Sequence, residues 1–167
     1  MAVTVRAYEP ADHDAVARLT IDAYRVDGQL GEETGAYAHH LSDVAARVRD
    51  GELLVAVDDT GQVLGAVTFA LAGTPYAQLA QDGEAEFRML AVDPAAQGQG
   101  VGEALTKACL ARAAAAGCAA VVICTRDFAK AAQRLYDRLG FRREPALDWS
   151  PEPGVLLLGL RYQLAAH

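Results

Sequence analysis

The sequence lacks the features that mark several specialised classes of protein. Its 167 residues contain no run of about 18 apolar residues, the length that a membrane-spanning helix needs. Its composition, 52% hydrophobic and 22% charged, excludes intrinsic disorder. The three cysteines, Cys109, Cys118 and Cys124, lack the paired short spacing of a zinc site, so we expect buried free thiols and no metal. We also find no internal repeat and no linker-like segment.

Positive charge is also in short supply. The formal net charge is −7, whereas a protein that binds phosphate backbones presents a basic face. We therefore expect no nucleic-acid partner and no membrane association, and the charge mildly favours a cationic small partner. The segment "MAVTVRAYEP" has neither a basic lead nor a long apolar stretch, so we expect no signal peptide and a cytoplasmic location.

What the sequence does contain is one alternating series of strands and helices. We expect a single domain over residues 3–165, which is an ordinary size for one core. Periodicity and turn residues predict strands at 3–8, on both sides of 58–61, at 84–92, at 119–125 and in two closing segments, 141–149 and 155–164. Helices are expected from Pro10 to Ala23 and at 36–49, 101–116 and 128–139. This order predicts an α+β fold, a three-layer α/β/α arrangement around a mixed, mostly antiparallel sheet with one crossover.

Three of these segments have a specific expected face. In 36–49, Leu41, Val44 and Val48 follow helical spacing. In 128–139, Phe128, Ala132, Leu135 and Leu139 do the same, and Gly140 is expected to end that helix. In the strand 84–92, alternation assigns one face to Glu84, Glu86, Arg88, Leu90 and Val92.

Three glycines at alternate positions, Gly98, Gly100 and Gly102, lie between that strand and the following helix. A glycine-rich turn entering a helix presents free backbone N–H groups and the positive end of the helix dipole, an arrangement that binds phosphate. The other interpretation is a flexible loop whose glycines only end a strand. The dinucleotide pattern G-x-G-x-x-G fails, because Glu103 or Leu105 stands where the last glycine belongs, and no G-K-[ST] sequence is present.

In this stretch the sequence resembles the GNAT superfamily of acyl-CoA-dependent N-acyltransferases. The family signature [QR]-x-x-G-x-[GA] after an apolar-x-Val strand end is met by Gln97–Gly102 following Leu90-Ala91-Val92. A second family feature is met by Ala132, Tyr136, Gly140 and Phe141. By element order the resemblance extends from about residue 3 to 164.

The resemblance implies how acetyl-CoA would bind. The pantetheine arm would pair with the strand at Leu90 and Val92, the 97–102 turn would hold the pyrophosphate, and the sheet would splay at this cleft, between 84–92 and 119–125. Relatives often have an asparagine where this chain has Ala129, and Thr125, Arg126 or Lys130 would then substitute for it. The residues assigned to the coenzyme on this basis are Leu90, Ala91, Val92, Gln97, Gly98, Gln99, Gly100, Val101, Gly102 and Thr125.

The resemblance also implies the catalytic groups for direct acetyl transfer to a primary amine in a ternary complex. Glu86, six residues before Val92, is the candidate general base, acting through water, with Glu84 as the backup. Tyr136 is the candidate proton donor to the coenzyme sulfur. A backbone N–H near Leu90 or Ala91 would hold the oxyanion. The other interpretations are a surface or salt-bridged glutamate and a core tyrosine.

The acceptor has no recognisable motif. Tyr24, Tyr37, His39, His40 and Trp149 remain unassigned, with ordinary packing or a solvated helix face as the simpler interpretation. Acidic residues suit a cationic amine; they are Asp27, Glu32, Glu33, Asp82 and Glu84. Two other functions stay open at this point, a non-catalytic acyl-CoA-binding sensor or regulatory module and a protein-interaction domain. A homodimer, with the last strand pairing between chains, is also possible.

Overall fold

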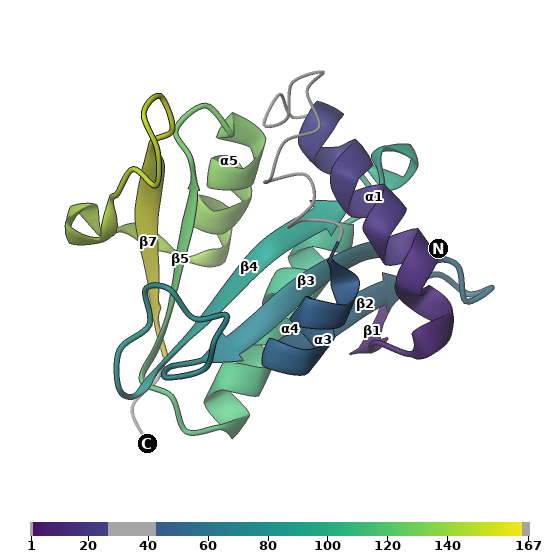
Figure 1. Ribbon diagram of the computed structural model, residues 1–167, viewed down its shortest axis with the longest axis horizontal. Helices are drawn as coiled ribbons and strands as arrows, with labels where there is room; N and C mark the ends of the chain where they lie inside the picture. Colours follow the sequence, from purple (N-terminus) through teal and green to yellow (C-terminus); the bar gives the residue numbers. More distant parts are fainter. Residues whose placement is uncertain (1, 27–42, 165–167) are drawn as a thin grey trace. The chain divides into compact units, whose positions relative to one another are not determined.

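The computed structural model describes residues 2–26 and 43–164, and these form two compact units. Of the described residues, the first unit contains 2–26, 43–69 and 89–109, and the second contains 70–88 and 110–164. The described strands are β1 (Thr4–Ala7), β2 (Glu52–Val57), β3 (Val63–Leu71), β4 (Glu84–Val92), β5 (Ala120–Arg126), β6 (Arg142–Arg143) and β7 (Leu157–Gln163). The described helices are α1 (His13–Val26), α3 (Val44–Asp50), α4 (Val101–Ala115) and α5 (Lys130–Leu139) (Figure 1).

Hydrogen bonding orders the described strands β1-β2-β3-β4-β5-β7-β6, with antiparallel pairs and one parallel pair. This confirms the α+β fold with a mixed sheet that the sequence predicts. The strand 84–92 and the order of the described elements are confirmed as well. Both predictions rest on strong local patterns of apolar and turn residues.

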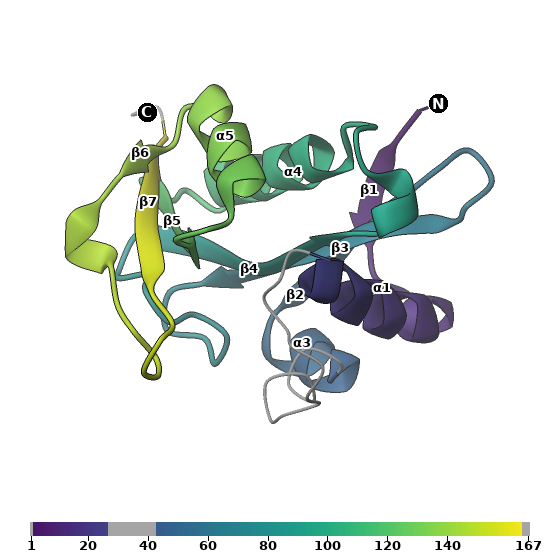
Figure 2. The same ribbon diagram turned by 90° about the horizontal axis from the view of Figure 1, so that it is seen from above.

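The first unit is built on an antiparallel meander. β1 pairs with β2, and β2 pairs with β3 across the predicted turn, in which Gly61 has a φ of 87°. Helices α1 and α3 lie on one face of this sheet and α4 on the other (Figure 2). α4 packs closely on β3, since a Cβ at Gly65 would lie 2.8 Å from Val101 Cγ1 and 3.1 Å from Leu105 Cδ1.

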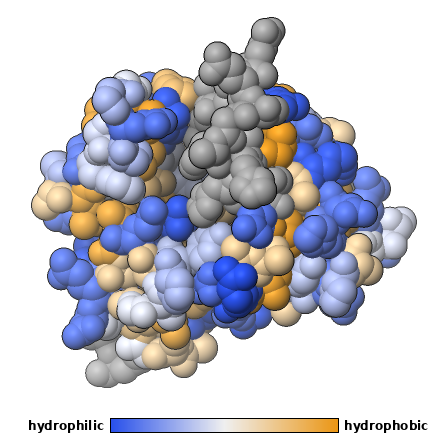
Figure 3. Space-filling model, in the orientation of Figure 1, coloured by the Kyte–Doolittle hydropathy of each residue, from blue (hydrophilic) through white to orange (hydrophobic). Residues whose placement is uncertain are grey.

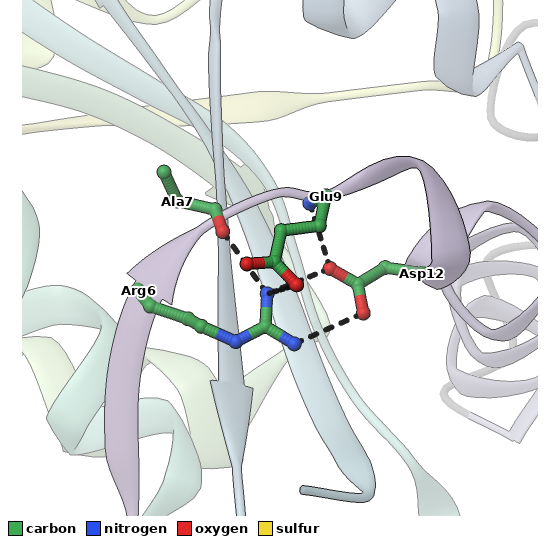
Figure 4. Close-up of polar contacts among 4 residues, drawn as sticks. All are labelled: Arg6, Ala7, Glu9 and Asp12. Carbon is green, nitrogen blue, oxygen red and sulfur yellow. Dashed lines mark hydrogen bonds and ion pairs between the residues drawn. The ribbon is translucent and has the colours of Figure 1, made fainter.

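An ion pair fixes the entry into α1. Asp12 closes the short turn Pro10–Asp12 and accepts hydrogen bonds from both terminal nitrogens of Arg6, at 2.8 and 3.1 Å (Figure 4). The Glu9 backbone N–H donates to the same carboxylate at 2.8 Å. These bonds lower the pKa of Asp12, with the Arg6 side chain as the main cause. The helix expected from Pro10 thus begins as a 3-10 turn, Pro10–Asp12, and continues as α1 from His13.

The second unit contains the parallel pair. The first residues of β4, Glu84–Glu86, pair with Ala120–Val122 of β5, and β5 pairs along its length with β7. Its core includes a series of neighbouring rings, with centroids 5.3 to 6.2 Å apart; they are Phe87, Tyr136, Phe141 and Tyr162. Gly140 ends α5 in the left-handed conformation, as the sequence predicts.

Two expected buried faces are wrong in part. In α3 the fully buried residues are Val44 and Arg47, whereas Val48 is 41% exposed. Arg47 occupies the inner position because its guanidinium has hydrogen-bond acceptors there. Phe128 lies before α5 and is 42% exposed, with the Arg126 guanidinium 4.6 Å from its ring centre. Leu41 lies outside the described residues.

The closing segment 141–149 is also less regular than expected. Only Arg142–Arg143 form a strand, β6, and Trp149 makes an isolated bridge to Leu157. Pro145 begins a 3-10 turn, Pro145–Leu147, because its ring fixes φ and removes a donor from the strand ladder.

Among the described helices, none is long and apolar enough to cross a membrane. The face shown in Figure 3 intersperses hydrophilic and hydrophobic residues outside its grey part. Isolated exposed apolar residues of this kind are normal on a folded domain.

Candidate active site

The predicted glycine turn, residues 97–102, follows Asp93 and a short 3-10 turn, Pro94–Ala96, and runs into α4, which begins at Val101 in the first unit. Gly98 and Gly100 have φ values of 80° and 81°, a conformation that glycine adopts without the penalty of a Cβ. A Cβ built on either glycine meets no atom within 4 Å in the described part of the chain. The turn therefore needs glycine for its backbone conformation, and the space beside both residues is open to a ligand.

Asp93 fixes the start of this turn. Its backbone N–H donates to the Leu64 carbonyl at 2.8 Å, and its side chain accepts from the Ala95 N–H at 3.1 Å and from Arg18 at 3.2 Å. Ala96 and Val101 are buried on either side of the glycines. The first N–H groups of α4 have no acceptor within the helix, so the anchored turn offers them to an anion.

Met89 has a left-handed backbone conformation that the sequence did not reveal. Its φ is 56°, and among the described residues it alone combines a positive φ with a side chain. The buried Arg47 donates to the Met89 carbonyl at 3.4 Å, to the Thr68 hydroxyl at 2.7 Å and to the Thr20 hydroxyl at 3.3 Å. The alternation of β4 continues through this residue, because Ala85, Phe87, Met89 and Ala91 are all buried whereas Glu84, Arg88, Leu90 and Val92 are half-buried.

In the second unit, Glu86 is 1% exposed and differs from both simple interpretations of a strand glutamate. Its Oε1 accepts hydrogen bonds from the backbone N–H groups of Gln78, Leu79 and Ala80, at 2.8, 2.8 and 3.1 Å. Its Oε2 is buried and has no hydrogen-bond partner among the described residues. Glu86 is therefore neither a surface residue nor bound at Oε1 by a cation.

Glu84 has both carboxylate oxygens engaged. Its Oε2 pairs with Arg161 of β7, and its Oε1 accepts from the Gln81 backbone N–H at 2.9 Å. This geometry matches the salt-bridged interpretation and does not favour Glu84 as the backup base.

Tyr136 is buried on α5, with its ring centre 5.4 Å from that of Phe141 and 6.0 Å from that of Phe87. Its packing matches the interpretation as a core tyrosine, and its role as a proton donor stays a prediction. Ala129 is the N-cap residue of α5 and, in the described chain, makes no side-chain capping bond. Thr125 lies near the end of β5, opposite Leu158 of β7.

Arg88 and Cys124 of the second unit lie near Glu86. Arg88 donates to the Tyr76 carbonyl at 3.2 Å, and its guanidinium lies 5.3 Å from the centre of the Tyr76 ring. Burial is the main cause that raises the pKa of the Cys124 thiol.

Most of the unassigned acceptor candidates lie outside the described residues. Tyr24 is buried in α1 of the first unit, and Asp82 is exposed in the second. The remaining candidates, Asp27, Glu32, Glu33, Tyr37, His39 and His40, lie outside the described residues. Over residues 2–26 and 43–164, no group of three or more His, Cys, Asp or Glu side chains is arranged to hold a metal ion.

Curated relatives of the chain share one name. It is 38% identical over 149 residues to the mycothiol acetyltransferase of Salinispora tropica, covering 84% of this chain and 45% of the relative. It is 34% identical over 143 residues to the mycothiol acetyltransferase of Streptomyces avermitilis, covering 83% and 42%. The chain thus spans less than half the length of these relatives.

Solved structures share its fold. A GCN5-related N-acetyltransferase from Kribbella flavida has a TM-score of 0.72 and 27% identity, with 98% of each chain covered. A GNAT-family acetyltransferase from Staphylococcus aureus has a TM-score of 0.74 and 12% identity, covering 98% of this chain and 100% of its own. The yncA acetyltransferase from Salmonella typhimurium, solved with its cofactor acetyl-CoA, has a TM-score of 0.68 and 22% identity, covering 100% and 96%.

The family assignment follows from the sequence match together with this fold. The model of the acetyltransferase (GNAT) family matches residues 14–141, which include β4, the glycine turn and α5. The chain belongs to the acetyltransferase (GNAT) family.

Proposed function

We propose that this protein transfers an acetyl group from acetyl-CoA to a primary amine by direct transfer in a ternary complex. The observation that carries the proposal is the glycine turn. In a member of this family, Gly98 and Gly100 present open space and helix N–H groups directly after β4.

On the coenzyme side, the backbone does most of the binding. The turn from Gln97 to Gly102 holds the pyrophosphate, and the main-chain groups of Leu90 and Val92 pair with the pantetheine arm as an added strand does. Thr125 is the candidate to replace the side-chain contact that Ala129 lacks. Backbone contacts of this kind tolerate variation in the side chains around them.

On the chemical side, the reaction forms a C–N bond, breaks the C–S bond of the thioester and moves one proton from the amine to the leaving thiolate. Glu86 accepts the amine proton through a water molecule, and the Tyr136 hydroxyl protonates the thiolate. A backbone N–H near Leu90 or Ala91 stabilises the oxyanion of the tetrahedral intermediate.

The acceptor is a primary amine of a small molecule or peptide. The name of these relatives, mycothiol acetyltransferase, does not define the acceptor of this chain, because the chain spans less than half of each of them. The acceptor is therefore best found by experiment.

A two-part measurement tests the proposal. Acetyl-CoA at millimolar concentration is expected to raise the melting temperature, because a ligand that binds only the native state stabilises it. A panel of polyamines, aminoglycosides, amino acids and peptides is then screened for CoA release. An unchanged melting temperature would refute the coenzyme site, whereas stabilisation without CoA release from any amine would favour a non-catalytic acyl-CoA-binding module.

A further inference from the structure

The loop between β3 and β4, residues 72–83, is fastened to β4 by three side chains at alternate positions. Glu84 accepts from the Gln81 N–H, and Glu86 accepts from the three N–H groups of residues 78–80. Arg88 donates to the Tyr76 carbonyl. The attachment points run backwards along the loop as the side chains run forwards along β4, so the loop returns along this strand.

The middle attachment differs from the other two. Three consecutive backbone N–H groups converge on one oxygen, the Oε1 of Glu86, at 2.8 to 3.1 Å. Successive N–H groups arranged in this way form an anion-binding concavity. A carboxylate oxygen that accepts three such bonds has no place left for a proton unless a donor withdraws.

The other oxygen of the same carboxylate is in the opposite situation. Oε2 is buried and has no hydrogen-bond partner among the described residues. Buried polar atoms in native proteins are nearly always bonded, and an exception calls for an explanation such as a catalytic role or a bound water.

We propose that Glu86 divides two tasks between its oxygens: Oε1 is the anchor by which the backbone of residues 78–80 orients the carboxylate, and Oε2 alone receives the proton. The 78–80 backbone is then a positioning element for catalysis. This inference rests on the proposed acetyl transfer for the role of Oε2, while the anchoring by Oε1 stands on the hydrogen bonds alone.

Two substitutions of Glu86 separate the tasks. In Glu86→Gln the amide oxygen still accepts from the three N–H groups, but the second atom becomes an NH₂ group that accepts no proton. In Glu86→Val both functions are lost. Amide hydrogen exchange at residues 78–80 reports the anchor, and CoA release with the best amine of the panel reports the proton transfer.

We expect Glu86→Gln to keep the protection of these amides within about threefold of the parent while the turnover number falls about 100-fold. Glu86→Val is expected to lose at least about tenfold in protection as well. Unchanged protection in Glu86→Val would overturn the anchoring role. If no amine releases CoA, the proposed function fails, yet the exchange data still decide whether Oε1 is the anchor.

A loop variant tests positioning without touching the carboxylate. Leu79→Pro removes one of the three donors, whereas the control Leu79→Ala keeps the backbone N–H. We expect Leu79→Pro to lower kcat about tenfold or more with an unchanged KM for acetyl-CoA, and Leu79→Ala to stay near the parent value. Circular dichroism and the melting temperature confirm that both variants fold. A folded Leu79→Pro protein with the parent kcat would overturn the positioning role.

Discussion

Arg47 in the first unit and Glu86 in the second are both buried charged side chains, and they are held in different ways. Arg47 distributes its donors over three elements: the Thr20 hydroxyl of α1, the Thr68 hydroxyl of β3 and the Met89 carbonyl of β4. Glu86 receives all three of its described bonds from one loop, on one oxygen.

The difference follows from the shapes of the two groups. A guanidinium has five N–H donors in a rigid fork and joins several elements at once. A carboxylate bound at one oxygen keeps the other for a different use. A buried charge by itself therefore does not mark a reactive site, whereas a buried atom whose hydrogen-bonding capacity is unfilled is a better indicator.

The largest expected effect comes from removing the guanidinium. Arg47→Met should lower the free energy of unfolding by about 3 kcal/mol, because it removes hydrogen bonds to a charged group and leaves their acceptors buried. Glu86→Gln should cost only about 1 kcal/mol, since its amide oxygen keeps the three N–H bonds. Urea denaturation of both variants measures the difference. If Glu86→Gln lost more free energy of unfolding than Arg47→Met, this would contradict the view that Arg47 stabilises the fold while the Oε2 of Glu86 serves catalysis.

The sequence predicts the locally determined features of the fold better than the surroundings of the two buried charged side chains. The glycine turn, the bounds of β4 and the left-handed Gly140 follow from local patterns of residues that are adjacent in the chain. The position of Arg47 does not, because its acceptors come from residues 20, 68 and 89. Helical spacing therefore selected Val48 for the buried face, and no local signal revealed the left-handed Met89.

The attachment of the 72–83 loop to β4 could not be predicted from the sequence either. Glu86 was identified through a resemblance in sequence position, but its three N–H partners are loop amides, which carry no side-chain signature. The distinction between Glu84 and Glu86 likewise depends on Arg161, 77 residues away from Glu84 in the chain. Contacts between distant residues set the chemistry here, and periodicity does not report them.

A second prediction sharpens the account of Arg47 by changing one of its acceptors. Thr68→Val keeps the shape of the side chain but removes the hydroxyl that accepts at 2.7 Å, so we expect a loss of about 2 kcal/mol in the free energy of unfolding. Thr68→Ser keeps the hydroxyl and is the matched control, with a smaller loss from the missing methyl group. Equal losses in the two variants would show that packing, and not the bond to Arg47, matters at this position.

A third prediction compares two glycines that share the left-handed conformation, one in the glycine turn and one in the turn between β2 and β3. Gly100 and Gly61 have φ values of 81° and 87°, and a Cβ at either meets no described atom within 4 Å. Alanine at each should therefore cost the same, about 1 kcal/mol, from the left-handed conformation. Only Gly100→Ala should also weaken acetyl-CoA binding, measured by calorimetry. Equal coenzyme affinities in the two variants would argue against the glycine turn as the pyrophosphate site.

The smallest expected effect comes from an exposed ion pair in the second unit, which contrasts with both buried groups. Asp148 accepts from two nitrogens of Arg143, at 2.8 Å each, and from the Gly159 N–H at 2.6 Å. Arg143, followed by Gly159, lowers the pKa of Asp148 from its usual 3.8 to about 2. Because the folded-state pKa is the lower one, the stabilisation is complete above about pH 4 and is lost as the pH falls toward 2.

The comparison of the parent with Asp148→Asn therefore depends on pH. The melting temperatures should differ slightly above about pH 4, where solvent weakens an exposed pair, and converge as the pH falls toward 2. Arg143→Met should show the same convergence, because it removes the main cause of the lowered pKa of Asp148. A difference between parent and Asp148→Asn that stays constant from pH 6 to pH 2 would mean that the titration of this carboxylate does not contribute to stability.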